Sequence, residues 1–152
     1  MGAGAVGRVA VMSIKPQFAD GILNGSKRVE FRKRGLASDV TTVIIYATMP
    51  VGKLVGVFDV AGYDVGSPSA IWEMHKRHAG ISRRGFREYY RGRKLAVAIQ
   101  VADPRRLARP LALAELDTGL RPPQSFCYLE LEVRSDAGEW SVGTALLPAS
   151  VD

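Results

Sequence analysis

The chain has 152 residues, of which 47% are hydrophobic and 24% are charged, and its formal net charge is +6. That balance indicates a globular domain with one core, and the length is too short for two ordinary domains. The absence of any apolar run of about 18 residues excludes a membrane-spanning helix, and the single cysteine, Cys127, excludes an internal disulfide and favours a reducing, cytoplasmic setting.

The N-terminal part of the chain predicts a strand followed by a helix. Residues 1–8 are glycine-rich, and we expect a flexible tail there. Residues 9–14 are apolar and partly β-branched, which is typical of a strand. Pro16 suits the first turn of a helix, and apolar residues then recur at helical spacing as far as Leu23. Gly25 is expected to end this helix, because glycine tolerates the left-handed conformation of a helix C-terminus.

Residues 25–32 combine a turn glycine, a lysine, a glutamate and two arginines in a short stretch. In a strand, Arg28, Glu30 and Arg32 would share one face, while the two apolar residues between them point into a core. A carboxylate between two guanidiniums is held ionised, and the remaining positive charge is free to meet a phosphate. The alternative is an edge strand with a solvated, salt-bridged outer face.

The next segments predict a hairpin and a helix. Residues 42–47 read as a buried strand and residues 54–60 as its partner, so Tyr46 and Lys53 are expected near each other at one end of the hairpin. The alternative is an ordinary strand-end tyrosine and a solvated turn lysine. Ser67 and the proline after it predict the start of a helix that runs to about residue 78.

Most of the positive charge falls between Met74 and Lys94, where eight basic residues stand against one acidic residue. This window carries +7 and leaves about −1 for the rest of the chain, so it creates a local field that attracts polyanions. Ser82 is expected to cap a second helix, in which Phe86 and Tyr90 anchor the helix to the core. The basic residues that we expect to contact nucleic acid are Arg28, Arg32, Arg34, Lys76, Arg83, Arg84, Arg87, Arg91 and Arg93.

The C-terminal third predicts strands at residues 94–101 and 126–133, with a break at 103–106 and an irregular connection over 107–116 that holds one helical turn. Two prolines before Gln124 and Ser125 restrict the backbone and aim both polar side chains. A turn at 135–138 leads to an extra strand at 139–142, followed by a weak tail.

The pattern Gly25-x-Lys27-x-x-Glu30-x-Arg32 resembles the signature of the ASCH domain family of the PUA-like superfamily. The resemblance implies an α+β fold, a small β-barrel of about five to seven strands surrounded by short helices. It implies a domain over residues 9–133, with residues 134–152 as a C-terminal hairpin strand and tail packed on the same domain. It also implies a cleft beside the signature that binds RNA or modified nucleosides.

Three functions follow from these observations. The first is nucleic-acid binding, to RNA in preference to DNA, through the basic cleft. The second is a hydrolase of the same cleft, either a divalent-metal-assisted ribonuclease or an amidohydrolase on a modified nucleoside. The third is an interaction domain for an acidic protein partner. The glutamate at position 30 weighs against the amidohydrolase, because the resemblance places a threonine there in that branch.

For the hydrolase, Lys27 would act as a base whose pKa is lowered by Arg28 and Arg32, and Glu30 would carry a proton. Three further cleft groups would position the substrate or stabilise an oxyanion, namely Tyr46, Lys53 and Ser125. No resident cofactor is expected beyond a divalent cation in the nuclease case. His75 and His78 lack a third ligand in the sequence, so we expect no metal centre there.

Overall fold

The computed structural model describes residues 7–116, 119–129, 132–134, 139–142 and 145–148, and its centre is a six-stranded mixed sheet. The strands are β1 (Arg8–Ile14), β2 (Val29–Arg32), β3 (Val40–Ala47), β4 (Lys53–Gly66), β5 (Ala96–Leu111) and β6 (Phe126–Leu129). Their order is β2-β5-β4-β3-β1-β6, with β1 parallel to β3 and the other pairs antiparallel. A separate three-stranded sheet contains β7 (Glu132–Arg134), β8 (Glu139–Val142) and β9 (Ala145–Pro148).

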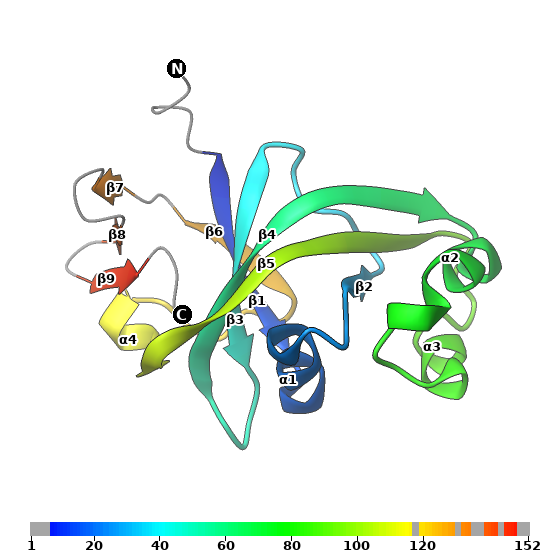
Figure 1. The fold of residues 1–152 in the computed structure, drawn as a ribbon, viewed down its shortest axis with the longest axis horizontal. Helices are drawn as coiled ribbons and strands as arrows, with labels where there is room; N and C mark the ends of the chain where they lie inside the picture. The colour runs from blue at the N-terminus through cyan, green and yellow to red at the C-terminus, as the bar shows by residue number, and fades with distance from the viewer. Residues whose placement is uncertain (1–6, 117–118, 130–131, 135–138, 143–144, 149–152) are drawn as a thin grey trace.

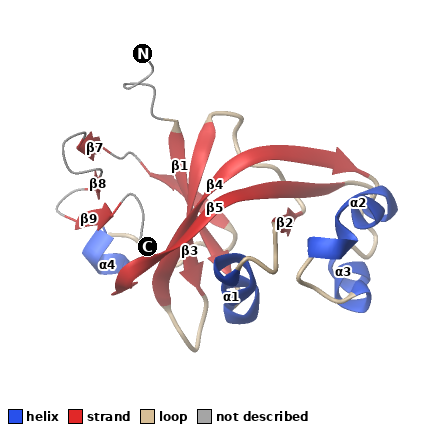
Figure 2. Ribbon diagram, in the orientation of Figure 1, coloured by secondary structure: helices blue, strands red, loops and turns tan. Residues whose placement is uncertain are grey.

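The helices lie around the sheet and at both ends of its long β4–β5 ribbon (Figure 1). They are α1 (Pro16–Asn24), α2 (Pro68–His75), the 3-10 turn η1 (Lys76–His78), α3 (Arg83–Tyr89) and α4 (Leu113–Leu116). Helices α2 and α3 form a lobe at one end of the ribbon, and α4 lies at the other end, as Figure 2 shows. Within the described residues, none of these helices has the length and apolar content needed to cross a membrane.

The central part of the sheet is buried on both faces, because apolar side chains of its strands point alternately into a hydrophobic cluster on each side. In β1, Val9 and Val11 belong to one hydrophobic cluster, while Ala10 and Met12 belong to another that includes Ile22 of α1. A third cluster lies under the α2–α3 lobe. Its members are Val29, Phe31, Ile71, Ala79, Phe86, Tyr90, Ala96 and Ala98. The expected anchoring of helix α3 to the core by Phe86 and Tyr90 is confirmed.

The sheet stays open, so the barrel expected from the sequence is not formed. Strands β2 and β6 are the two edges. The gap between them is crossed by a side chain instead of a ladder: Arg32 of β2 donates to the carbonyl of Ser13 in β1 and to the hydroxyl of Ser125 just before β6. The two edges are therefore linked through the side chain of Arg32 and not through backbone pairing.

The predicted break at 103–106 is wrong, because β5 continues to Leu111. The registers Asp59↔Ala102 and Val57↔Arg105 leave residues 103 and 104 bulged out of the ladder. Asp103 has a positive φ of 47°, and Pro104 lacks the N–H that a regular ladder needs, so a bulge is where both fit. Strand β4 is likewise longer than the predicted 54–60.

The C-terminal predictions are confirmed in part. The expected strand over 126–133 is divided into β6 and β7, which belong to different sheets, and residues 130–131 lie outside the described residues. The extra strand at 139–142 is confirmed as β8. The weak tail is wrong for residues 145–148, which form β9. The predicted turn at 135–138 lies outside the described residues, as does most of the N-terminal tail.

Candidate functional site

The stretch from Gly25 to Arg32 links α1 to the edge strand β2. Gly25 takes the left-handed conformation, with φ of 88°, and its N–H donates to the carbonyl of Ile22, so the helix ends as the sequence predicts. The backbone N–H of Lys27 then donates to the carbonyl of Gly21 at 2.9 Å. This turn directs the Lys27 side chain back under α1 and places Glu30 and Arg32 on the adjoining strand.

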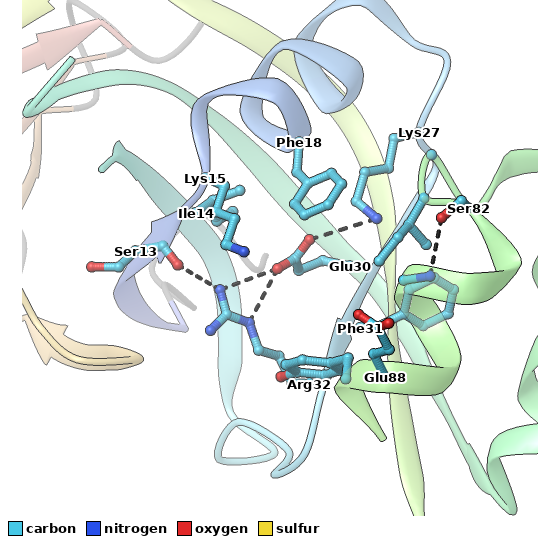
Figure 3. Close-up of a pocket in the computed structure, with 14 residues that line it drawn as sticks. Ser13, Ile14, Lys15, Phe18, Lys27, Glu30, Phe31, Arg32, Ser82 and Glu88 are labelled. Atoms are coloured by element: carbon cyan, nitrogen blue, oxygen red, sulfur yellow. Dashed lines mark hydrogen bonds and ion pairs between the residues drawn. The ribbon is translucent and has the colours of Figure 1, made fainter. Parts of the chain in front are cut away.

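Lys27, Glu30 and Arg32 form one buried charge network (Figure 3). One carboxylate oxygen of Glu30, Oε2, accepts from Arg32 Nε at 3.1 Å, and the other, Oε1, lies 3.9 Å from Lys27 Nζ. Arg32 Nη2 donates to the carbonyl of Ser13 at 2.7 Å and Nη1 to the hydroxyl of Ser125 at 3.1 Å. Arg32 is therefore committed to protein acceptors on three sides.

Arg28 does not join this network, contrary to the predicted pair of guanidiniums around Glu30. Its side chain is exposed. Its backbone N–H donates to the carbonyl of His78 and its carbonyl accepts from Val101 N, which fixes the residue just before β2 begins. The second cation beside Glu30 is the Lys27 ammonium instead.

Lys27 is 2% exposed, and its ammonium is held by polar and aromatic groups together. Nζ donates to the carbonyl of Ala79 at 2.6 Å and lies 5.2 Å from the ring centre of Phe18 and 4.9 Å from that of Phe31. Burial lowers the pKa of Lys27 from its ordinary value; the negative charge of Glu30 opposes this shift, and Arg32 adds to it. The sequence prediction of a lowered pKa holds, but its main cause is desolvation and not the neighbouring arginines.

The network forms the floor of a cavity of about 660 Å³, which we call the Lys27 pocket. Its other walls come from the end of β1, the start of α1 and one face of α3 (Figure 3). The lining residues are Ser13, Ile14, Lys15, Phe18, Lys27, Glu30, Phe31, Arg32, Gly80, Ile81, Ser82, Gly85, Glu88 and Tyr89. The pocket thus combines three cations and two carboxylates with three aromatic rings, in a volume typical of small-ligand sites.

Of the lining residues, only Lys27, Glu30 and Arg32 were predicted as site residues. Those that the sequence reasoning missed include Lys15, Phe18, Gly80 and Tyr89. Gly80 has φ of 64°, and a Cβ built on it would lie 2.5 Å from Lys27 Cβ, so only glycine fits at this wall. The sequence signal for Gly80 was its place after a helix, which predicts a helix stop and nothing about Lys27. Burial raises the pKa of Tyr89, and Lys33 Nζ lies 4.7 Å from the Tyr89 ring centre.

Of the remaining predicted catalytic residues, one contacts the charge network and two do not line the Lys27 pocket. Ser125 contacts the network through Arg32. Tyr46 is buried in the cluster on the sheet face that carries Val9 and Val11, and it does not line the pocket. Lys53 is exposed and pairs in register with Ala47, directly beside the Tyr46↔Leu54 pair. The expected closeness of Tyr46 and Lys53 in the hairpin is confirmed.

The residues predicted to contact nucleic acid are exposed, except Arg32, whose guanidinium belongs to the network. Those of the basic window lie on the α2–α3 lobe and the turn that follows it. Two of them are ion-paired, Lys76 with Glu73 at 2.8 Å and Arg84 with Glu88 at 3.5 Å.

The two histidines do not form a metal site. His75 Nε2 lies 2.7 Å from Asp64 Oδ2, and Gln100 donates to the same oxygen at 2.9 Å, so His75 ties α2 to strands β4 and β5. His78 is exposed. Over the part of the chain that the structure describes, no three His, Cys, Asp or Glu side chains are grouped to hold a metal ion.

Comparisons with known proteins match this chain to one family model and to several named relatives. A family model described as the ASCH domain matches residues 12–105. The chain is 34% identical over 127 residues to a Zymomonas mobilis protein named ASCH domain-containing ribonuclease, with 81% of this chain and 85% of that protein covered. It is also 31% identical over 104 residues to a large ribosomal subunit protein of Ureaplasma parvum, covering 68% of this chain and 33% of that protein.

Solved structures of the Zymomonas mobilis ASCH protein share this fold. The crystal structure of ASCH from that organism matches with a TM-score of 0.75 at 32% identity, covering 80% of this chain and 87% of that chain. A variant in which one tyrosine is replaced by phenylalanine matches with a TM-score of 0.74, and one in which a serine is replaced by alanine with 0.75. The tyrosine variant is 31% identical, with 80% of this chain and 90% of that chain covered. The serine variant is 32% identical, with 82% of this chain and 90% of that chain covered.

Proposed function

Because the chain belongs to the ASCH domain family, we propose that it binds RNA, with one nucleotide held in the Lys27 pocket. The observation that carries this proposal is the buried Lys27–Glu30–Arg32 network at the floor of a cavity with aromatic walls. A cavity of about 660 Å³ accommodates a nucleotide. Aromatic rings provide faces on which bases stack, and cations provide partners for phosphate.

The groups that meet the phosphate are Lys15 and Lys27. Arg32 is already bonded to Glu30, Ser13 and Ser125, so its role is to hold the floor in place. Lys15 lines the pocket and is exposed, and within the described residues its side chain makes no hydrogen bond or ion pair. Its ammonium is therefore available to a ligand without breaking an existing contact.

The base would meet the aromatic wall. Tyr89 and Phe18 stand on different elements, α3 and α1, and both line the pocket. The exposed arginines of the adjacent lobe extend the positive field beyond the pocket, which favours a polyanion over an isolated small molecule. The relative named as a ribonuclease points to RNA as the polyanion.

The binding proposal is tested by fluorescence anisotropy with a labelled 12-nucleotide single-stranded RNA at 50 to 200 mM salt. The logarithm of the association constant should fall linearly with the logarithm of salt, by about 0.7 per neutralised phosphate. Lys15→Gln should reduce that slope by about 0.7. Arg109→Gln removes the same charge at an exposed site at the α4 end of β5 and should leave the slope unchanged. Affinity that does not respond to salt would refute the proposal.

Hydrolysis of the bound RNA is a second candidate function, favoured by the lowered pKa of Lys27. A neutral lysine amine can accept the proton of a ribose 2′-hydroxyl, whose oxygen then attacks the adjacent phosphorus and releases the 5′-oxygen, with Glu30 as the nearest proton carrier. The 5′-oxygen takes up the proton that Lys27 accepted, relayed through the Glu30 carboxylate, and leaves as a hydroxyl. The products would be a 2′,3′-cyclic phosphate and a 5′-hydroxyl.

Cleavage is tested by incubating the same RNA with the protein, with and without Mg²⁺ or Mn²⁺. Lys27→Ala should abolish cleavage while RNA is still retained. Tyr46→Phe, Lys53→Ala and Ser125→Ala belong in the same series, since a tyrosine and a serine have been replaced in the Zymomonas mobilis protein. Unchanged cleavage by Lys27→Ala would remove Lys27 from the mechanism, and retention without cleavage would leave binding as the function.

A further inference from the structure

Helix α3 borders a second hollow with the face that is turned away from the Lys27 pocket. Gly85, Glu88 and Tyr89 line the pocket on one side of the helix. Residues at the alternate helical positions line a separate groove of about 390 Å³ between α2 and α3, which we call the arginine groove. Its lining residues are Pro68, Ser69, Trp72, Glu73, Arg83, Phe86, Arg87, Tyr90 and Arg93. A single short helix thus separates two hollows.

The aromatic part of the groove is a packed stack. The Trp72 ring lies 5.0 Å from the Phe86 ring centre, tilted by 46°, and Phe86 lies 4.8 Å from Tyr90. Phe86 and Tyr90 are buried, whereas Trp72 is half-buried and lines the groove. The indole is therefore held in place from below and presents its remaining surface to a ligand.

The charged part of the groove is mostly uncompensated. Arg83, Arg87 and Arg93 line it and are exposed, and none of the three makes an ion pair or side-chain hydrogen bond within the described residues. The one carboxylate of the lining, Glu73, is bonded to Lys76 at 2.8 Å, which together with Arg83 lowers the pKa of that carboxyl. Three guanidiniums with open donors around an aromatic face thus remain for a ligand.

We propose that the arginine groove is a second nucleotide subsite, in which a base stacks on Trp72 while Arg83, Arg87 and Arg93 hold the flanking phosphates. The inference rests on the proposed function, because it has one RNA strand continue from the Lys27 pocket across α3. Guanidiniums bind phosphate in a bidentate geometry, and a base offers the flat surface that an indole needs. An acidic peptide would satisfy the charges but not the indole face.

The crossing distance suits a short piece of nucleic acid. A helix with its side chains is about 10–12 Å across, so the two hollows are separated by roughly that thickness. A dinucleotide is too short to cross the helix and fills the Lys27 pocket alone, while a longer strand engages both hollows. Length dependence therefore separates the two subsites experimentally.

The test uses the full chain with labelled single-stranded RNAs of 2 and 12 nucleotides. Arg87→Gln and Trp72→Leu should each weaken binding of the 12-mer by about tenfold, as expected for loss of one phosphate contact or one stacked base. Both variants should bind the dinucleotide as the wild type does. Arg109→Gln is the matched control, because it removes the same charge at an exposed site that lines neither hollow; it should bind both RNAs as the wild type does.

Tryptophan fluorescence gives a second readout that a packing defect does not reproduce. The 12-mer should quench the emission of the wild type, and Trp72→Phe should lose most of that quenching while keeping tight binding, since phenylalanine still offers a stacking face. If the 12-mer binds Trp72→Leu and Arg87→Gln as tightly as it binds the wild type, the arginine groove is not a nucleotide subsite. The proposal that RNA binds in the Lys27 pocket would stay intact. Failure of both RNAs to bind wild type would refute both, and quenching by an oligoglutamate peptide without RNA binding would assign the groove to an acidic protein.

Discussion

Glu30 is the residue on which the charge network of the Lys27 pocket depends. It is 6% exposed and is the only carboxylate in contact with both Lys27 and Arg32 among the residues that the structure describes. Two buried cations that share one anion are stable together only while that anion is present. Glu30 is therefore needed to balance the charges of Lys27 and Arg32, apart from any role in binding.

Glu30→Gln should destabilise the protein more than Lys27→Met does. The glutamine leaves Lys27 and Arg32 buried without a counter-charge, at a cost of about 3–5 kcal/mol. The methionine leaves the Glu30–Arg32 pair intact and mainly removes the donor to Ala79 O, at about 1–3 kcal/mol. Urea unfolding of both variants measures the difference. A larger loss in Lys27→Met would show that the network does not depend on Glu30 in this way.

The stability difference between wild type and Lys27→Met should depend on pH. Because burial lowers the pKa of Lys27 in the folded state, the unfolded chain binds more protons than the folded chain between that lowered pKa and 10.5, the ordinary value. The free energy of unfolding attributable to Lys27 therefore rises with pH across this window and is lowest below it. Urea unfolding of both proteins should show the wild type becoming more stable relative to the variant as the pH rises through this window towards 10.5. A constant difference would mean that the folded-state pKa is not lowered.

At the scale of elements, the predictions held where the chain carries strong local signals and failed where packing decides. Pro16, Gly25 and Ser82 mark helix ends, and the structure places α1 and α3 accordingly. Pro104 reads locally as a strand break, but the ladder continues past it through a bulge that depends on the partner β4. Local sequence signals carry no information about the partner strand β4, so the continuation of β5 through a bulge could not be predicted.

The same distinction explains what was predicted of the site. Lys27, Glu30 and Arg32 lie within a few residues, so their spacing indicates a shared site. Ser125 reaches Arg32 from 93 positions away, and Ala79 reaches Lys27 from 52. Such contacts arise only from the tertiary fold, which brings distant segments of the chain together. The predicted role of Arg28 failed because it precedes β2, where strand alternation does not yet apply.

Gly80 joins η1 to the turn before α3 and sets how closely these elements approach Lys27. Gly80→Ala should cost distinctly more stability than Gly92→Ala. Both glycines have positive φ, 64° and 74°, so both alanines incur a backbone cost of about 1–2 kcal/mol. Only at Gly80 would the new Cβ meet another side chain, 2.5 Å from Lys27 Cβ, whereas nothing lies within 4 Å at Gly92. Equal losses of unfolding free energy for the two variants, measured by urea unfolding, would show that Lys27 moves aside for the new Cβ at position 80 without strain. RNA affinity should fall in Gly80→Ala alone, because the displaced Lys27 narrows the pocket.

At the scale of the whole molecule, the fold separates a stable sheet from a charged lobe. The long ribbon of β4 and β5 carries α2 and α3 away from the two clusters that sandwich the central strands (Figure 1). The lobe has its own smaller cluster, and it is tied back by Tyr90, whose hydroxyl donates to the carbonyl of Arg32 at 2.8 Å. The basic window thus lies on the lobe, while the two larger hydrophobic clusters lie around the central strands.

Hydrogen exchange should therefore show two levels of protection. Amides of α3 should exchange through local opening of the lobe, faster than those of β3, because opening the lobe exposes only the smaller cluster while exposing β3 requires global unfolding. Adding the 12-nucleotide RNA should slow exchange in α3 and in the turn around Gly80, because a ligand that contacts both faces of the helix binds only the closed lobe. Exchange in β3 should change far less. Mass spectrometry of peptic peptides measures both regions in one experiment, and the lobe and β3 exchanging at one common rate would show that the molecule opens as a single unit.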